Sequence, residues 1–207
     1  MFIEKIIQNI TENIKLPRAQ VERQLMPIIE IFIENIINNY YDEENTIKLI
    51  SSEFPIPIGK DKKSKSVDFL LLNTRNNNLS FVELKTCSNS FETEQVNIYQ
   101  NTIQKIKTDS ATFLYDFLDS LDNKKFKYLK KVIDSRICPQ EWSIINQANL
   151  IYIAPNKLKT KKWGDEKFKI IEKLELLPFS ELTIKPEQPY FTEWQLINNL
   201  MNILNSN

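Results

Sequence analysis

Histidine is absent from this 207-residue chain, and glycine and cysteine occur only twice each. Without histidine, the chain has no Ser-His or Cys-His nucleophile pair, no imidazole for acid–base catalysis and no histidine-ligated zinc. Two glycines, Gly59 and Gly164, exclude a glycine-rich phosphate loop and a dinucleotide-binding fingerprint. Cys87 and Cys138 cannot form a zinc or iron–sulfur site by themselves, and we expect both to be reduced thiols in a cytoplasmic protein.

A net charge is missing as well, because 27 Lys and Arg residues balance 27 Asp and Glu residues. The chain therefore has no global field that attracts polyanions, and a nucleic-acid partner would have to meet a local basic patch. No apolar run approaches the length of a membrane-spanning helix, so we expect no membrane association. The 42% apolar and 26% charged fractions are typical of a folded chain with a sizeable core.

The hydrophobic pattern predicts an α/β fold with a central mixed β-sheet flanked by helices. We expect a single domain with a helical N-terminal part over residues 1–41, a core over about 46–155 and a C-terminal extension over 156–207. Helices are predicted over residues 2–16, 18–41 and 192–204. Strands are predicted over residues 46–58, where two prolines end the strand, and over 67–72, 79–85 and 148–154.

The strands over residues 67–72 and 79–85 carry charged groups inside otherwise apolar sequence. An Asn-rich turn centred on residues 75 and 76 joins them as a hairpin and puts Asp68 opposite Glu83. Because side chains alternate along a strand, Asp68, Glu83 and Lys85 then share one face. Both faces of the hairpin are apolar elsewhere, which is typical of a central element of a sheet.

Two carboxylates facing each other need a compensating group, because like charges ~4 Å apart repel by ~4 kcal/mol at an effective dielectric near 20. Either one carboxyl group is protonated or a divalent cation lies between them. Oxygen ligands without His or Cys favour Mg²⁺, Mn²⁺ or Ca²⁺ over zinc. With Lys85 on the same face to orient a water or stabilise a phosphate, the cluster suits metal-assisted phosphodiester hydrolysis.

Three further groups of residues accompany the hairpin. Asn89 is predicted to cap a helix, with Glu92 three residues later completing a capping box, and this helix carries Gln95 and Tyr99 one turn apart on the same side. Glu22 falls inside the apolar stripe of the second helix, whereas Glu30 lies at its edge. The basic segment over residues 59–66 reads either as a solvated loop or as a contact for phosphates, and its lysines are Lys60, Lys62, Lys63 and Lys65.

In this order and spacing, VDFLLL, FVELKT and the Gln-x-x-x-Tyr run from Gln95 to Tyr99 resemble the PD-(D/E)XK nuclease superfamily, in its RecB-like and lambda-exonuclease-like branch. Val67 stands where that family commonly has a proline. The resemblance implies a restriction-endonuclease-like core and a metal-dependent nuclease that acts most often on DNA. It implies that Asp68, Glu83 and the Leu84 carbonyl bind Mg²⁺ or Mn²⁺, that Lys85 positions the attacking water, and that Gln95 and Tyr99 line the cleft. The family's helix glutamate is matched best by Glu22 and next by Glu30.

Two other hypotheses remain open from the sequence. The chain could be a nuclease-like binding module without catalysis, or an unrelated α/β scaffold in which the charged cluster is a buried ion-pair network. The substrate form, a homo-oligomeric state and a defence or repair partner protein are not determined by these motifs, since base readout depends on loops that the sequence does not place.

Overall fold

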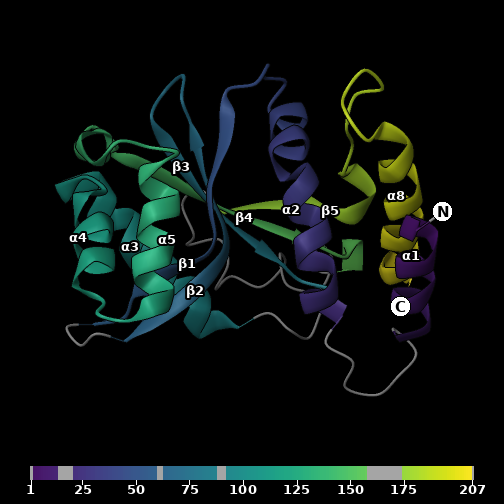
Figure 1. The fold of residues 1–207 in the computed structure, drawn as a ribbon, viewed down its shortest axis with the longest axis horizontal. Coiled ribbons are helices and arrows are strands. Elements are labelled where there is room, and N and C mark those ends of the chain that lie inside the picture. The colour runs from purple at the N-terminus through teal and green to yellow at the C-terminus, as the bar shows by residue number, and fades with distance from the viewer. Residues whose placement is uncertain (1, 14–20, 60–62, 88–91, 158–173, 207) are drawn as a thin grey trace. The chain divides into compact units, whose positions relative to one another are not determined.

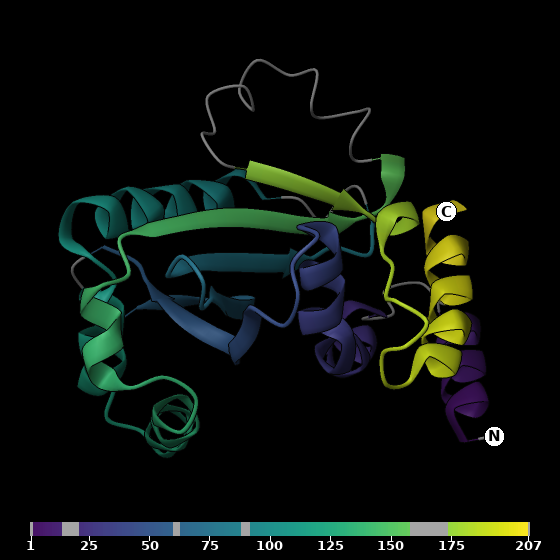
Figure 2. The same cartoon turned by 90° about the horizontal axis from the view of Figure 1, so that it is seen from above.

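The structure is a computed structural model that describes residues 2–13, 21–59, 63–87, 92–157 and 174–206. Its strands form a five-stranded mixed sheet in the order β1-β2-β3-β4-β5, flanked by helices, as Figures 1 and 2 show. The predicted α/β class with a mixed sheet is therefore confirmed at this level. None of the helices that the structure describes has an apolar stretch long enough to traverse a bilayer.

The chain divides into two compact units, which we describe separately. The hairpin unit comprises Thr46–Glu83 and Glu92–Ile151, and the terminal unit comprises Met1–Asn45, Leu84–Phe91 and Tyr152–Asn207. The predicted N-terminal part and C-terminal extension fall together in the terminal unit, and most of the predicted core falls in the hairpin unit.

The hairpin unit begins with three antiparallel strands, β1 (Ile47–Pro57), β2 (Ser64–Asn73) and β3 (Asn78–Leu84). The helices α3 (Thr93–Asp109), α4 (Thr112–Ser120) and α5 (Lys124–Asp134) all contact β1. A 3₁₀-helix, η1 (Pro139–Ser143), leads into β4 (Gln147–Ala154), which ends in the terminal unit. Burial follows the predicted pattern, because Phe69 and Leu70 point to opposite faces of β2 and are both fully buried.

The range predicted for the first strand, 46–58, agrees with β1, but Pro55 and Pro57 do not break the strand: they pair with Ser66 and Ser64. An outer strand tolerates proline because one side of its backbone has no partner strand, and β1 lies at one edge of the sheet. The start of β2 differs from the prediction, because this pairing draws Ser64–Ser66 into β2 and part of the expected basic loop is strand.

The terminal unit contains α1 (Phe2–Asn13), α2 (Val21–Tyr40), β5 (Leu174–Pro178), the 3₁₀-helix η2 (Phe179–Glu181) and α8 (Phe191–Ser206). Figures 1 and 2 show α1 and α8 side by side. The apolar face of α2 packs inward: Phe32 is 2% exposed, and its ring centroid lies 5.2 Å from that of Trp194 in α8. Periodic apolar positions therefore predicted the buried side of α2 correctly.

Candidate functional site

The β2–β3 hairpin has the register that its Asn-rich turn predicts. Leu70 pairs with Phe81 and Asn73 with Asn78, and the last recorded pair is Phe69 with Val82. Extending this register by one residue brings Asp68 level with Glu83. Glu83 is only 1% exposed, whereas Asp68 is half-buried. The structure thus brings the two predicted carboxylates to neighbouring strands, one of them almost out of reach of water.

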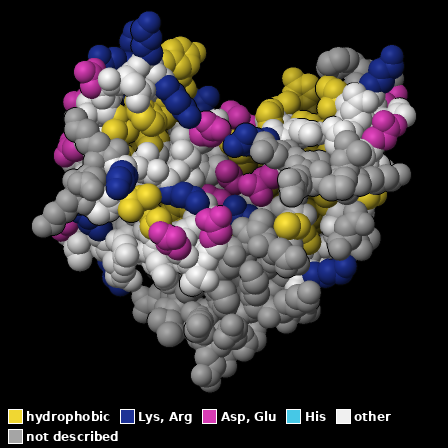
Figure 3. Space-filling view, turned by 90° about the horizontal axis from the view of Figure 1, so that it is seen from below, with side chains coloured by type: hydrophobic (Ala, Val, Ile, Leu, Met, Phe, Trp, Pro, Cys, Tyr) yellow, Lys and Arg dark blue, Asp and Glu magenta, His cyan; other side chains and the backbone are white. Residues whose placement is uncertain are grey.

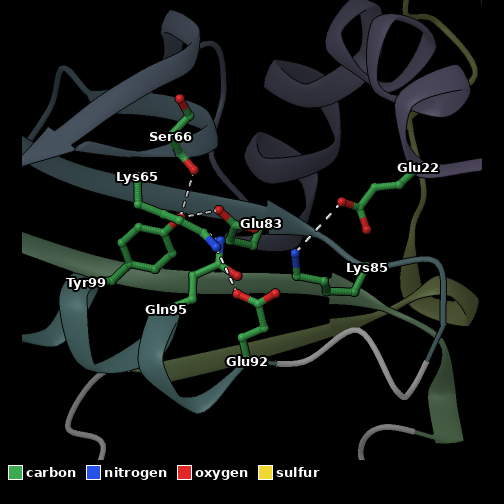
Figure 4. Close-up of polar contacts among 8 residues, drawn as sticks. All are labelled: Glu22, Lys65, Ser66, Glu83, Lys85, Glu92, Gln95 and Tyr99. Carbon is green, nitrogen blue, oxygen red and sulfur yellow. Dashed lines mark hydrogen bonds and ion pairs between the residues drawn. The ribbon is translucent and has the colours of Figure 1, made fainter. Parts of the chain in front are cut away.

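A buried carboxylate needs hydrogen bonds, and Glu83 receives one from α3. The Tyr99 hydroxyl donates a short hydrogen bond to Glu83 Oε1, and Gln95 Nε2 donates to the same hydroxyl at 2.9 Å (Figure 4). The Ser66 carbonyl oxygen lies 3.0 Å from the Tyr99 hydroxyl and competes for its single hydrogen. The four groups form one network between α3, β2 and β3.

Gln95 can donate to the Tyr99 hydroxyl, which reaches Glu83, because Gln95 and Tyr99 lie one helical turn apart on the buried side of α3. Gln95 is 4% exposed and Tyr99 is fully buried, with its ring centroid 6.1 Å from that of Phe81 on β3. Phe81 and Glu83 share a face of β3 because they are two residues apart. The sequence predicted this pair of helix residues but missed Glu83 as the acceptor of the Tyr99 hydroxyl. The signal for the acceptor was available: a glutamate inside an apolar strand needs a nearby donor.

Lys85 follows the end of β3 and belongs to the terminal unit. Its backbone N–H donates to the Ile153 carbonyl of β4 at 2.8 Å, and its side chain is only 8% exposed. The Lys85 Nζ atom lies 3.9 Å from Glu22 Oε1 on α2, and the Glu22 side chain is 32% exposed (Figure 4). Of the two candidate helix glutamates, Glu22 is thus the one that the structure pairs with Lys85. Glu30 is half-buried, two turns further along α2.

The predicted phosphate-contacting lysines are only partly within the described residues. Lys60 and Lys62 lie outside them, and Lys63 is exposed just before β2. Lys65 lies on β2, and its Nζ atom forms an ion pair with Glu92 Oε2 at 2.8 Å. Acidic partners thus offset part of the expected positive charge. On the face drawn in Figure 3, acidic and basic side chains of the described residues are interspersed.

The start of α3 differs from the prediction. The helix begins at Thr93 after the N-cap residue Glu92, which makes no side-chain capping hydrogen bond. Asn89, the predicted cap, lies outside the described residues. The Glu92 carboxylate instead binds Lys65, so an expected local capping contact is replaced by one between residues far apart in sequence.

The donor set can be tested against a metal ion. Among the described residues there is no group of three or more His, Cys, Asp or Glu side chains arranged to hold a metal. Mg²⁺ nevertheless needs only one or two carboxylates, because water and substrate phosphate complete its shell. The hydrogen bond from Tyr99 engages one oxygen of Glu83, and a carboxylate accepts at several positions. By their chemistry, Asp68, Glu83 and the Leu84 carbonyl offer oxygen ligands, the type that Mg²⁺ and Mn²⁺ prefer.

Shifted pKa values occur in a different cluster, on α4 and α5. Burial is the main reason that the pKa of Tyr115 is raised. The pKa of Lys130 is also raised, mainly because its ammonium group donates to the Tyr115 hydroxyl at 2.7 Å, with Asp134 adding to the effect. In the terminal unit, burial and the neighbouring Glu175 raise the pKa of Tyr40. Mutual hydrogen bonds and ion pairs explain the Tyr115–Lys130 cluster as a stabilising surface network.

Comparisons with protein-family models, with curated proteins and with solved structures found no match to this chain. The functional reading of the site therefore depends on its residues and their geometry.

Proposed function

We propose that this protein is a metal-dependent nuclease, with a restriction-endonuclease-like core, that hydrolyses phosphodiester bonds in DNA. The observation that carries the proposal is the hydrogen-bonded Glu83 carboxylate, which is 1% exposed and level with Asp68 on the next strand. Burying a carboxylate costs several kcal/mol (about 2–7 even for a neutral polar group) unless it is paired or hydrogen-bonded. Tyr99 donates to Glu83, and Gln95 donates to Tyr99, so the Glu83 carboxylate is held in one orientation. A carboxylate held in this way suits the role of an oxygen ligand of a metal.

Each residue of the proposed site has a role that its position supports. Asp68 and Glu83, with the Leu84 carbonyl, would hold the metal, which supplies charge neutralisation and a more acidic bound water. Tyr99 fixes the orientation of the Glu83 carboxylate, and Gln95 fixes the Tyr99 hydroxyl; both are positioning residues. Lys85, two residues after Glu83, would hold the attacking water by a hydrogen bond and stabilise negative charge on the phosphate.

The test uses the purified chain with end-labelled linear DNA and circular DNA in the presence of Mn²⁺ or Mg²⁺. We expect cleavage, and we expect Asp68→Asn and Lys85→Met each to lower its rate by about 100-fold or more. Asp116→Asn and Lys107→Met are matched controls, because both residues are exposed in the hairpin unit, and they should cleave like the parent chain. Cleavage of linear DNA alone would indicate an exonuclease.

A second candidate function is a nuclease-like module that binds nucleic acid or protein without catalysis. The lack of a three-residue metal cluster among the described residues favours this alternative. Titration calorimetry with Mn²⁺ separates the two. Binding that Asp68→Asn abolishes supports the nuclease. No binding at millimolar Mn²⁺, together with no cleavage of DNA or RNA, would refute the nuclease and leave the module.

A further inference from the structure

The outer face of α5 carries three exposed residues in a row, Lys124, Tyr128 and Lys131, which we call the α5 stripe. Their spacing of four and three residues places them on the same side of the helix. Tyr128 is 71% exposed, the highest value among the exposed large hydrophobic side chains of the described residues. An aromatic ring held this far out in water makes little contribution to the core and is available to a partner.

The charges around the stripe are unequal. The other lysines of α5 each have an acidic partner: Lys125 with Glu53, Lys127 with Asp122, and Lys130 with Asp119 and Asp134. Within the part of the chain that the structure describes, Lys124 and Lys131 have no acidic side chain at ion-pair distance. Among the described residues, no ion pair therefore offsets the positive charges of the two lysines on either side of Tyr128, although the net charge of the chain is zero.

We propose that the α5 stripe binds a single-stranded nucleic acid, with one base stacked on Tyr128 and the adjoining phosphates at Lys124 and Lys131. The two lysines lie seven positions apart in the helix, or about 10 Å along the axis. Aromatic stacking together with flanking cations is the general means of holding unpaired strands. A duplex keeps its bases inside, so it would use the lysines but leave Tyr128 without a role.

The stripe is connected to the candidate site within the hairpin unit. Lys125, in the first turn of α5, forms a 2.9 Å ion pair with Glu53 of β1. The residues on either side of Glu53 pair with those on either side of Asp68, so Glu53 is level with Asp68 on the neighbouring strand. This ion pair therefore connects the first turn of α5 to β1 at the level of Asp68. The proposal rests on the proposed function for its substrate class, and it names the single strand as the form that is held.

The test is fluorescence anisotropy of labelled oligo-dT and oligo-rU with the full chain in EDTA, where no metal-dependent cleavage occurs. We expect Tyr128→Ala to weaken binding by about tenfold or more, and Tyr128→Trp to retain it. Lys124→Ala and Lys131→Ala should each lower the slope of log affinity against log salt by about 0.7. Lys127→Ala is the matched control, since the charge of Lys127 is already paired with Asp122, and it should change affinity less than twofold.

Each result decides the inference. Unchanged affinity of Tyr128→Ala, or binding of duplex alone with an effect of the lysines but not of Tyr128, would overturn it. Binding of either oligonucleotide that depends on Tyr128 supports the inference, and the one of oligo-dT and oligo-rU that binds more tightly assigns the strand as DNA or RNA. Cleavage is scored separately: a chain that binds through Tyr128 but cuts nothing supports the stripe and contradicts the nuclease. Tyr128 is exposed, so circular dichroism of Tyr128→Ala should match that of the parent chain.

Discussion

Replacing Tyr99 by Phe should lower the free energy of unfolding of the hairpin unit by about 2–4 kcal/mol. The ring keeps its volume and its packing on Phe81, so the loss comes from hydrogen bonds alone. The bond from the Tyr99 hydroxyl to the Glu83 carboxylate is charge-assisted, about 1.5–3 kcal/mol. The bond from Gln95 adds about 1 kcal/mol, because its buried amide would lose its acceptor.

Urea denaturation followed by circular dichroism measures this loss, with Tyr115→Phe as the control. The Tyr115 hydroxyl also has two polar partners, accepting from Lys130 and donating to Asp134, but the groups around it are partly exposed. We therefore expect Tyr115→Phe to cost less than about 1 kcal/mol. Equal losses in the two variants, or no loss in Tyr99→Phe, would refute the idea that Glu83 depends on this hydroxyl.

A double-mutant cycle makes the reasoning more specific. If the Tyr99 hydroxyl acts on the Glu83 carboxylate, Tyr99→Phe should cost less in a Glu83→Gln background than in the parent chain. We expect a coupling energy of about 1 kcal/mol or more, within the range found for residues in contact. Additive losses would place the main effect of the hydroxyl at the Ser66 carbonyl instead.

Two further predictions concern ion pairs. Because the pKa values of Lys130 and Tyr115 are raised above their ordinary values, the folded chain holds protons that the unfolded chain loses above about pH 10. The stabilisation from these two groups is complete below that pH and is lost as the pH rises. Lys130→Met should therefore destabilise the folded chain at pH 8 and progressively less above pH 10 in urea titrations. A difference that does not depend on pH would contradict this. Glu22→Gln should lower the free energy of unfolding by about 1 kcal/mol in the same assay and slow any DNA cleavage, because it removes a carboxylate 3.9 Å from the buried Lys85. Glu30→Gln is the control: it should change the free energy of unfolding by less than about 0.5 kcal/mol and cleave normally. The reverse order would assign the helix carboxylate to Glu30.

The strand pairing of the hairpin was predictable because it depends on local information. The Asn-rich turn sets which residues oppose each other, and side-chain alternation then decides which of them share a face. The recorded pair of Phe69 with Val82 agrees with the predicted position of Asp68 opposite Glu83. The same local reasoning gave the buried stripe of α2 and the buried strand β4.

The contacts that distinguish the site depend on segments far apart in the sequence, and the sequence did not specify them. Glu92 was expected to complete a local capping box, but it pairs with Lys65, 27 residues earlier. Ser66 was expected in a loop, but its carbonyl lies beside Tyr99 because β1 draws this segment into β2. Pattern and spacing predict which side of an element is buried; they do not predict which donor and acceptor meet there once the elements have packed.

The two prolines of β1 have a consequence for association between copies of the chain. β1 is one of the two outer strands of the sheet, and an outer strand with free backbone donors is a template on which a second chain can extend the sheet. Pro55 and Pro57 carry no N–H, so this end of β1 lacks the donors that such pairing needs. A second copy of this chain is therefore hindered from extending the sheet along this end of β1.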